Sequence, residues 1–469
     1  MPDPGRLTLL RSCAPLAASL WLTLALAAGP AAAQSLLSPA PISGAPAAPP
    51  PSLNLPAPPP VGAPVFSVPG APDPSLATPT IAAKPKPKRV APPAPPHETA
   101  LSGDPVPSFQ PETFFATAKA ADRYAAIMDA GGWPGVPPGL KAGGTGPGVT
   151  ALRARLLAEG DLGPGAGAGF DAPVTAALKK FQDRHGLRQS GVPAGATLAA
   201  LNIPASTRFR QLASSAQRLA GLNFAFGDRY IAVNIPSAAV ETVENGVVVK
   251  RYVAIVGDVD HPSPEVEAKV QAVNLNPTWT VPTSIIKNEI IPKMRKDPGY
   301  LARLKIRVLD NKGAEVNPSA IDWSGERAVN YTLRQDSGTG NSLGLIRINM
   351  PNKYSVYMHD TPGKAKFGAD YRFLSHGCVR VDGVYKLAEW LLQGVSGSPT
   401  GVWDAAAITS RIAAAQREDI RLPKAVPVAW VYMTGWASGD GTVHFRNDVY
   451  GYDVIGGEAR AENVVKPAR

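Results

Sequence analysis

Cysteine is almost absent from this sequence: 469 residues include only two, Cys13 and Cys378. Cys13 lies in a leader that we expect to be removed, so the mature protein keeps one thiol. A single thiol cannot form an internal disulfide bond. An unpaired cysteine in an exported protein has either a reactive role or a buried, inert one. The count alone leaves both readings open.

Long apolar runs are also scarce. The run at residues 16–28 is too short for a comfortable membrane span. It follows a positively charged start and precedes Pro30-Ala-Ala-Ala33, which is the order typical of a secretory signal. We therefore expect residues 1–33 to be a signal peptide cleaved before Gln34, and the mature protein to have no stable membrane span.

The sequence is basic, with a formal net charge of +10, yet no basic cluster resembles a nucleic-acid-binding motif. We expect no nucleic-acid partner. The densest basic run, residues 84–89, is compatible with a solvated linker or with attraction to an anionic wall or membrane surface. Many of the 50 prolines lie between residues 35 and 107, which predicts a disordered, proline-rich linker over residues 34–110.

Helical periodicity begins after this linker. Apolar spacing predicts a helical scaffold segment over residues 111–148 and a small module of short helices over residues 149–204. Asp171 stands where the N-cap of one of these helices is expected. A connecting helix is predicted within residues 205–227.

Strand-like alternation then takes over, at residues 230–235 and 247–256. Asn245-Gly246 precedes the second run and is a strong hairpin signal. Residues 345–349 and 354–359 continue the pattern, and residues 384–392 look helical. We predict an α+β protein with a β-rich domain over residues 228–398 and a C-terminal extension of that domain over residues 399–469.

The candidate chemistry lies in residues 375–381 (SHGCVRV), which contain the lone mature cysteine, and in His359. A thiol nucleophile needs a base to remove its proton. His376 is two residues before Cys378 and would face the same side of an extended strand, whereas His359 ends another strand. Gly377 permits close approach of a substrate, and the amide beside a nucleophile can bind an oxyanion.

Two other readings of these residues remain open. His359, His376 and Cys378 are enough ligands for a catalytic zinc site, although their spacing fits no standard zinc pattern. The second reading is a His–Cys pair with a purely structural role.

The motif itself resembles a known family. His359, followed by residues 375–380 (SHGCVR), is similar to the signature of the L,D-transpeptidase (YkuD) family. The sequences at 276–282, 341–347, 359–362 and 441–450 resemble its YcbB-like subgroup. Residues 170–187, with 191–192 and 197–201, resemble the three-helix peptidoglycan-binding module. Together these likenesses cover nearly everything from residue 111 to residue 453.

The resemblance implies a YkuD-type catalytic domain with a capping subdomain inserted at about residues 285–333. It implies a periplasmic enzyme that forms 3→3 cross-links between peptidoglycan stem peptides through a cysteine thioester and releases D-Ala. L,D-carboxypeptidase or endopeptidase activity through the same thioester, or attachment of a protein to peptidoglycan, are the alternatives. It also implies inhibition by carbapenems and no metal or organic cofactor.

The resemblance assigns roles to individual residues as well. Cys378 becomes the nucleophile and His359 the general base, with one ring nitrogen held by a main-chain carbonyl, expected to be that of Asp360. His376 becomes a supporting residue, and the amides of Gly377 and Cys378 become candidate oxyanion donors. The expected substrate-binding residues are Arg380, Tyr357 and Trp279.

Overall fold

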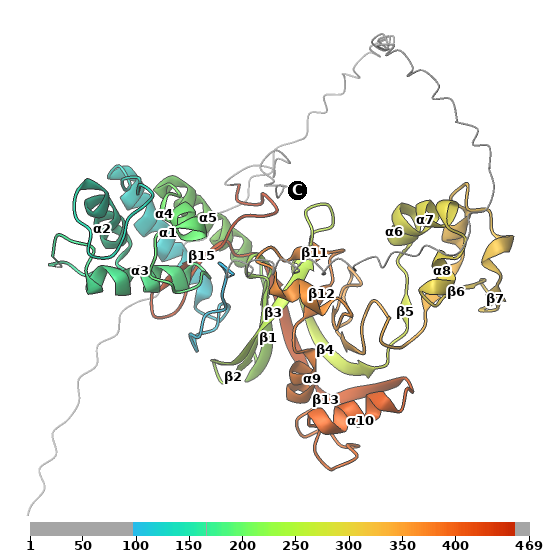
Figure 1. Cartoon of the computed structure of the whole chain (residues 1–469). Helices are drawn as coiled ribbons and strands as arrows, with labels where there is room; N and C mark the ends of the chain where they lie inside the picture. The colour runs from blue at the N-terminus through green and yellow to red at the C-terminus, as the bar shows by residue number, and fades with distance from the viewer. Residues whose placement is uncertain (1–96, 166, 455–469) are drawn as a thin grey trace, which may run out of the picture. The chain divides into compact units, whose positions relative to one another are not determined.

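The structure is a computed structural model that describes residues 97–165 and 167–454 (Figure 1). The predicted signal peptide and most of the predicted linker lie outside the described residues. Within the described ranges, no helix is both long enough and apolar enough to cross a membrane.

Five helices form the first part of the described chain. The apolar positions of α2 to α4 build one core, in which Leu152, Leu178 and Phe181 are fully buried. The Asp171 carboxylate accepts a hydrogen bond from the Val174 amide at 3.1 Å, which confirms the predicted N-cap of α3. The helices are α1 (Thr113–Asp129), α2 (Pro147–Glu159), α3 (Ala172–Arg184), α4 (Gly195–Leu201) and α5 (Ala205–Ala220).

A nine-stranded sheet follows, in the order β11-β3-β12-β10-β9-β4-β13-β1-β2. The long strand β3 also pairs with β2, so the sheet closes on itself. The Asn245-Gly246 turn joins β2 to β3, and both residues have positive φ (50° and 78°), as a two-residue hairpin requires. The strands are β1 (Arg229–Asn234), β2 (Ala239–Glu244), β3 (Val247–Gly257), β4 (Val266–Leu275), β9 (Ile346–Asn349), β10 (Met358–His359), β11 (Phe373–Ser375), β12 (Val379–Val381) and β13 (Glu418–Val431).

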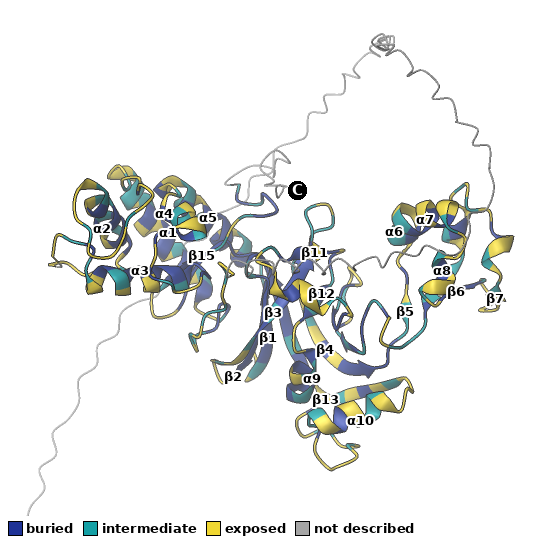
Figure 2. Ribbon diagram, in the orientation of Figure 1, coloured by how far each residue is buried: buried dark blue, intermediate teal, exposed yellow. Residues whose placement is uncertain are grey.

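Buried residues follow these strands, as Figure 2 shows. The helices α9 (Val384–Leu391) and α10 (Ala405–Ala413) add apolar side chains to the same core, and β14 (Gly435–Ala437) and β15 (Val443–Phe445) form a separate hairpin. A short 3₁₀ turn, η1 (Ile235–Ser237), links β1 to β2. Helices followed by a β-rich domain confirm the predicted α+β class. The strand predicted over residues 354–359 is shorter than expected, because only Met358 and His359 pair with neighbours.

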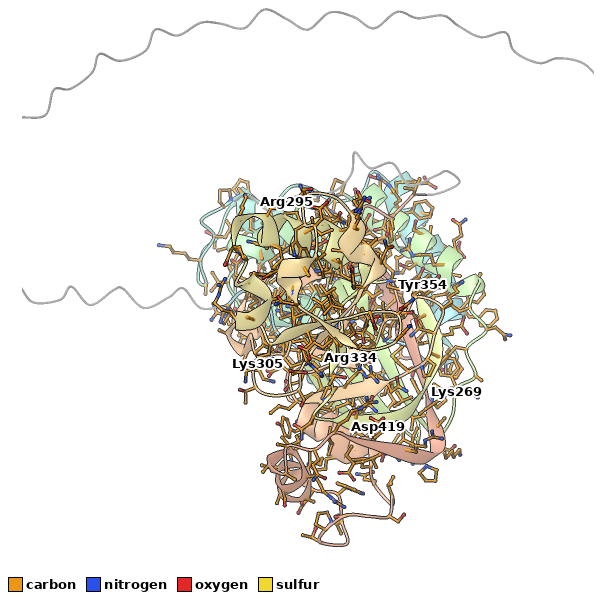
Figure 3. The ribbon with its side chains drawn as sticks, turned by 90° about the vertical axis from the view of Figure 1, so that its right-hand side faces the viewer. Lys269, Arg295, Lys305, Arg334, Tyr354 and Asp419 are labelled. Atoms are coloured by element: carbon orange, nitrogen blue, oxygen red, sulfur yellow. The ribbon has the colours of Figure 1, made fainter. Side chains whose placement is uncertain are left out.

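A smaller subdomain is inserted between β4 and β9. It has its own four-stranded sheet, in the order β5-β8-β6-β7, and its own core around Ile290, Leu301 and Leu333. Figure 3 labels Arg295, Lys305 and Arg334 on it. Its elements are β5 (Trp279–Thr280), α6 (Thr283–Ile285), η2 (Ile286–Ile290), α7 (Ile291–Lys296), α8 (Tyr300–Arg303), β6 (Ile306–Leu309), β7 (Glu315–Val316), η3 (Pro318–Ala320), η4 (Arg327–Asn330) and β8 (Thr332–Gln335).

Residues 97–110 correct the prediction of a disordered linker as far as residue 110. The Arg251 guanidinium donates to the main-chain oxygens of Ser102 and Val106, at 3.1 and 2.7 Å. The Glu241 carboxylate accepts from the amide and hydroxyl of Ser108, at 2.8 and 3.0 Å. Proline removes amide donors but leaves carbonyl acceptors. The buried ion pair between Arg251 and Glu241 therefore supplies hydrogen-bond partners to the main chain of this proline-containing segment.

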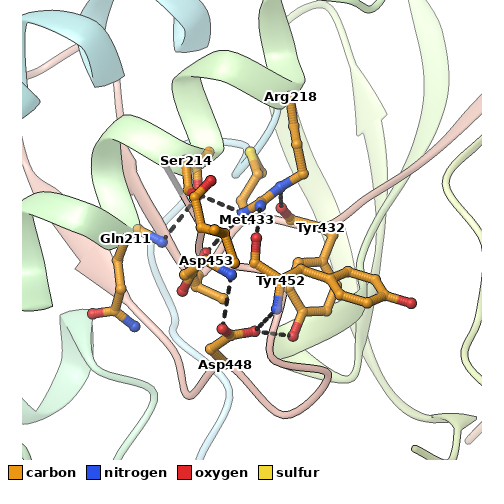
Figure 4. A network of polar contacts seen from close by, with 12 residues as sticks. Gln211, Ser214, Arg218, Tyr432, Met433, Asp448, Tyr452 and Asp453 are labelled. Atoms are coloured by element: carbon orange, nitrogen blue, oxygen red, sulfur yellow. Dashed lines mark hydrogen bonds and ion pairs between the residues drawn. The ribbon is translucent and has the colours of Figure 1, made fainter. Parts of the chain in front are cut away.

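The C-terminal end of the described chain is held in a similar way (Figure 4). Arg218 on α5 donates to the main-chain oxygens of Tyr432 and Tyr452, both at 2.9 Å, and pairs with the Asp453 carboxylate at 3.0 Å. The Tyr432 hydroxyl donates to Asp448 at 2.7 Å. These contacts join the connecting helix to the end of β13 and to the segment that follows β15.

We predict that Arg251→Ala destabilises the mature protein by about 3–5 kcal/mol, because the substitution leaves the buried Glu241 carboxylate unpaired. Urea unfolding followed by circular dichroism measures the change. Arg210→Ala, an exposed position on α5, is the control and should stay within about 0.5 kcal/mol of the parent. A loss of less than 1 kcal/mol for Arg251→Ala would show that the ion pair does not anchor the segment.

Candidate active site

Two short parallel strands decide which side chains share a face. β10 pairs with β12 in the register Met358↔Val379 and His359↔Arg380. Met358, Val379 and Val381 are fully buried in the core of the domain. Because side chains alternate along a strand, His359 and Arg380 lie on the opposite face.

Cys378 lies on this same face, immediately before β12. The Val379 amide donates to the main-chain oxygen of Tyr357 at 3.1 Å, so Cys378 is beside Tyr357 and diagonal to His359. Diagonal positions on neighbouring strands have Cα atoms about 7–8 Å apart, which an imidazole can bridge. The pairing therefore brings the predicted nucleophile and the predicted base within reach of each other.

The His359 ring has a defined tautomer. Its Nδ1 lies 2.5 Å from the main-chain oxygen of Asp360, the contact that the family resemblance implies. A carbonyl oxygen only accepts hydrogen bonds, so Nδ1 carries the proton and Nε2 keeps its lone pair. The Asp360 carboxylate is used elsewhere, since it accepts from the Leu345 amide at 3.1 Å and pairs with Lys364.

Burial shifts the pKa of both reactive groups in the direction that favours the neutral form. Burial, with a smaller effect of the Arg380 charge, lowers the pKa of His359 to about 4. Burial raises the pKa of the Cys378 thiol to about 11, although the Tyr357 main chain, Arg380 and Arg347 oppose the rise. Both pKa shifts favour a neutral thiol and a neutral imidazole over a thiolate–imidazolium pair.

The loop before Cys378 is bent, not extended. Gly377 has φ +100°, a conformation that favours glycine. Its carbonyl accepts from the Ser263 hydroxyl at 2.8 Å, and its amide donates to the Ser375 hydroxyl at 3.2 Å. No hydrogen bond from the Cys378 amide to another described residue is present. Of the two candidate oxyanion donors, the Gly377 amide is thus engaged and the Cys378 amide is not.

His376 does not follow the extended-strand expectation. Because of the bend at Gly377, the two-residue spacing no longer places His376 and Cys378 on one strand face. The His376 Nε2 contacts the Glu289 carboxylate at 2.7 Å, and its ring lies 4.4 Å from that of His261. Glu289 belongs to the inserted subdomain, so His376 joins the loop before the thiol to that subdomain.

The predicted substrate-binding residues gather around the same face. The Tyr357 ring lies 5.7 Å from the His359 ring, and the Trp279 side chain lowers the pKa of Tyr357 against the rise that burial causes, which places it near the Tyr357 hydroxyl. Trp279 begins β5, where the chain enters the inserted subdomain. Arg380 is the direct cross-strand neighbour of His359.

Sequence reasoning missed three residues of this site, namely Arg347, Ser263 and Glu289. Arg347 is opposite His359 on β9, and its guanidinium lies 5.5 Å from the centre of the Tyr357 ring. The alternation of residues 346–348 (IRI) was a usable signal for Arg347. Ser263 and Glu289 gave none, because each comes from a segment distant in sequence. Among the residues that the structure describes, no group of three or more His, Cys, Asp or Glu side chains is arranged to hold a metal ion.

A β-rich domain with a cysteine and a histidine on one face of a closed sheet defines a class of candidate thiol enzymes, and sequence comparison identifies its family. Residues 228–401 match the family described as "L,D-transpeptidase catalytic domain" (YkuD), and residues 145–201 match the "Putative peptidoglycan binding domain". The β-rich domain thus belongs to the YkuD family, and a peptidoglycan-binding domain precedes it. The likeness to the YcbB-like subgroup stays a prediction.

Individual relatives carry the same description. A protein of Haemophilus influenzae, named "Putative L,D-transpeptidase", is 34% identical over 246 residues, which are 52% of this chain and 48% of the relative. This chain thus matches about half the length of that curated relative. An L,D-transpeptidase from Xylanimonas cellulosilytica is 15% identical at a TM-score of 0.21, with 63% of this chain and 99% of that chain covered. One from Mycobacterium smegmatis is 14% identical at a TM-score of 0.21, with 43% and 58% covered.

The raised pKa of Cys378 predicts how its reactivity changes with pH. The alkylation rate with iodoacetamide should rise nearly tenfold for each pH unit between pH 7 and 9, because the thiolate fraction is still far from saturation there. Stopped or quenched time courses with intact-mass detection give the rates. A plateau between pH 5 and 8 would instead reveal a preformed thiolate–imidazolium pair.

Proposed function

We propose that this protein is a peptidoglycan L,D-transpeptidase that forms 3→3 cross-links between stem peptides. The observation that carries the proposal is the position of Cys378 and His359 on one face of a domain of the YkuD family. The adjacent domain of the peptidoglycan-binding family supports the same substrate. An exported, periplasmic location follows from the predicted signal peptide.

The first half-reaction forms a thioester. Cys378 Sγ attacks the carbonyl that joins the third stem residue, a diamino acid, to the terminal D-Ala, while its proton passes to His359 Nε2. The Nδ1 contact with Asp360 orients the ring for that transfer. The Cys378 amide stabilises the oxyanion, and the C–N bond breaks as His359 returns the proton to the departing D-Ala amine.

The second half-reaction forms the cross-link. The side-chain amine of a diamino acid on another stem attacks the thioester carbonyl, and His359 accepts the proton that this amine loses. The C–S bond breaks, and the thiol regains its proton from His359. Water in place of the amine gives L,D-carboxypeptidase or endopeptidase activity, and an amine on a protein gives attachment of that protein to peptidoglycan.

The surrounding residues receive supporting roles in this proposal. Tyr357 and Trp279 contact the stem peptide as it approaches the thiol, and Arg380 binds substrate. Gly377 allows the bend that exposes the Cys378 amide. His376 holds the inserted subdomain through Glu289, and this subdomain acts as a cap over the bound stems.

Mass spectrometry of the mature protein incubated with disaccharide-tetrapeptide tests the proposal. We expect a dimer that lacks one D-Ala. Cys378→Ala should abolish the product, and His359→Gln should lower its rate by about 10²- to 10⁴-fold, because a general base contributes that much. Circular dichroism spectra of both variants should match the parent spectrum.

The products separate the alternatives. Free tripeptide without dimer would identify a carboxypeptidase. A dimer formed equally by Cys378→Ala would refute the thiol mechanism, and no change in any substrate would refute the proposed activity of the isolated protein.

A carbapenem offers a second test of the thiol. Its strained carbonyl should acylate Cys378 and raise the intact mass of the protein by the mass of one carbapenem molecule. Cys378→Ala should show no such adduct, and an adduct of unchanged yield on that variant would assign the reaction to another residue.

A further inference from the structure

A row of polar residues crosses the sheet at the level of His359. The strand registers align Asp419 with Asn274, Asn274 with Arg347, Arg347 with His359, and His359 with Arg380. Residues aligned across strands point to the same face of a sheet. This face therefore presents an arginine on each side of His359. The row ends at Asp419 on β13, which Figure 3 labels.

Neither arginine has a carboxylate partner among the described residues. Arg347 Nε donates to the Asn274 side chain at 2.8 Å, and its other guanidinium nitrogens form no hydrogen bond within the described chain. Arg380 forms no ion pair there, and its Nε is buried without an acceptor. Asp360 follows His359 directly in the chain, but its carboxylate is taken by Lys364 and the Leu345 amide.

The acid at the end of this row, Asp419, contacts Asn274 and neither Arg347 nor Arg380. The Asn274 amide donates to the Asp419 carboxylate at 2.6 Å, and Arg417 also pairs with that carboxylate at 3.0 Å. The Asp419 contact fixes the amide so that its oxygen faces Arg347. Arg347 is thus oriented through Nε, while the rest of its guanidinium stays available beside Tyr357.

An unpaired cation in a partly buried site is costly unless a ligand neutralises it. Guanidinium groups match carboxylates in geometry as well as charge. We propose that Arg347, positioned by Asn274 and acting with Arg380, binds a substrate carboxylate within one residue of the bond that Cys378 attacks. This inference rests on the proposed function, which supplies the substrate. It adds the chemical group on that substrate, a carboxylate, that the two arginines recognise.

Two carboxylates of the proposed donor fit this description. One is the C-terminal carboxylate of the leaving D-Ala, and the other is a carboxylate on the side chain of the third residue, where that diamino acid carries one. Both lie close to the attacked carbonyl, and both satisfy the same pair of guanidinium groups.

A matched pair of alkylating agents tests the anion site without any peptidoglycan. Iodoacetate and iodoacetamide deliver the same reactive carbon, and only iodoacetate carries a carboxylate. We expect the iodoacetate-to-iodoacetamide rate ratio of Cys378 to exceed that of a small free thiol by about tenfold at low salt. Arg347→Gln should return the ratio to within about twofold of the free thiol. Arg210→Gln, on exposed α5, should leave it unchanged.

Two further variants separate positioning from folding. Asn274→Ala keeps both arginine charges but removes the contact that orients Arg347, so a partial fall in the ratio is expected. Arg347→Lys keeps the charge and should retain more of the ratio than Arg347→Gln does. A ratio in the parent protein no higher than that of the free thiol would overturn the proposal.

Substrate analogues then identify the carboxylate. One tetrapeptide ends in D-alaninamide, and the other has lysine in place of a carboxylated third residue. The analogue that lacks the recognised group should lose about 100-fold in kcat/KM with the parent protein. Arg347→Gln should lose about as much on the intact peptide and little more on that analogue. Equal losses by Arg347→Gln on all three peptides would overturn the proposal. A raised alkylation ratio with no peptide product would instead refute only the proposed function.

Discussion

The pairing of β10 with β12 is the constraint on which the candidate active site depends. Only two residue pairs define it, yet Met358, Val379 and Val381 anchor it in the core from beneath. A slip of one residue would turn these apolar side chains out of the core and point the His359 imidazole into it, at a large cost in apolar burial. Core packing therefore fixes the alignment of the thiol and the imidazole. No further contact is needed to set the register of β10 against β12.

The loop that carries the thiol depends on contacts from elsewhere in the chain. Ser263 holds the Gly377 carbonyl, and Glu289 of the inserted subdomain contacts His376. The bend at Gly377 turns His376 toward that subdomain and frees the Cys378 amide at the same time. The position of the inserted subdomain and the geometry of the proposed oxyanion site are thus linked through three consecutive residues.

Local patterns predicted much of this structure. Apolar periodicity found the helices from α1 to α5, the Asn245-Gly246 turn found the β2–β3 hairpin, and the motif around Cys378 found the family. What sequence reasoning missed depends on contacts between distant segments. The partners of Arg251 lie about 150 residues earlier in the chain, so proline content alone gave the wrong end for the linker. The bend at Gly377 was missed because a glycine permits an extended strand as readily as a turn.

Burial that raises the thiol pKa looks unfavourable for a nucleophile, but it suits a reaction in two steps. A neutral thiol and a neutral imidazole can share the face with two guanidinium groups without adding a further positive charge. When a substrate carboxylate neutralises those groups, as we propose, the smaller of the two effects that lower the His359 pKa weakens, because burial is the larger effect and the Arg380 charge the smaller. In the proposed mechanism, proton transfer from Cys378 to His359 is then easier with substrate bound than without it.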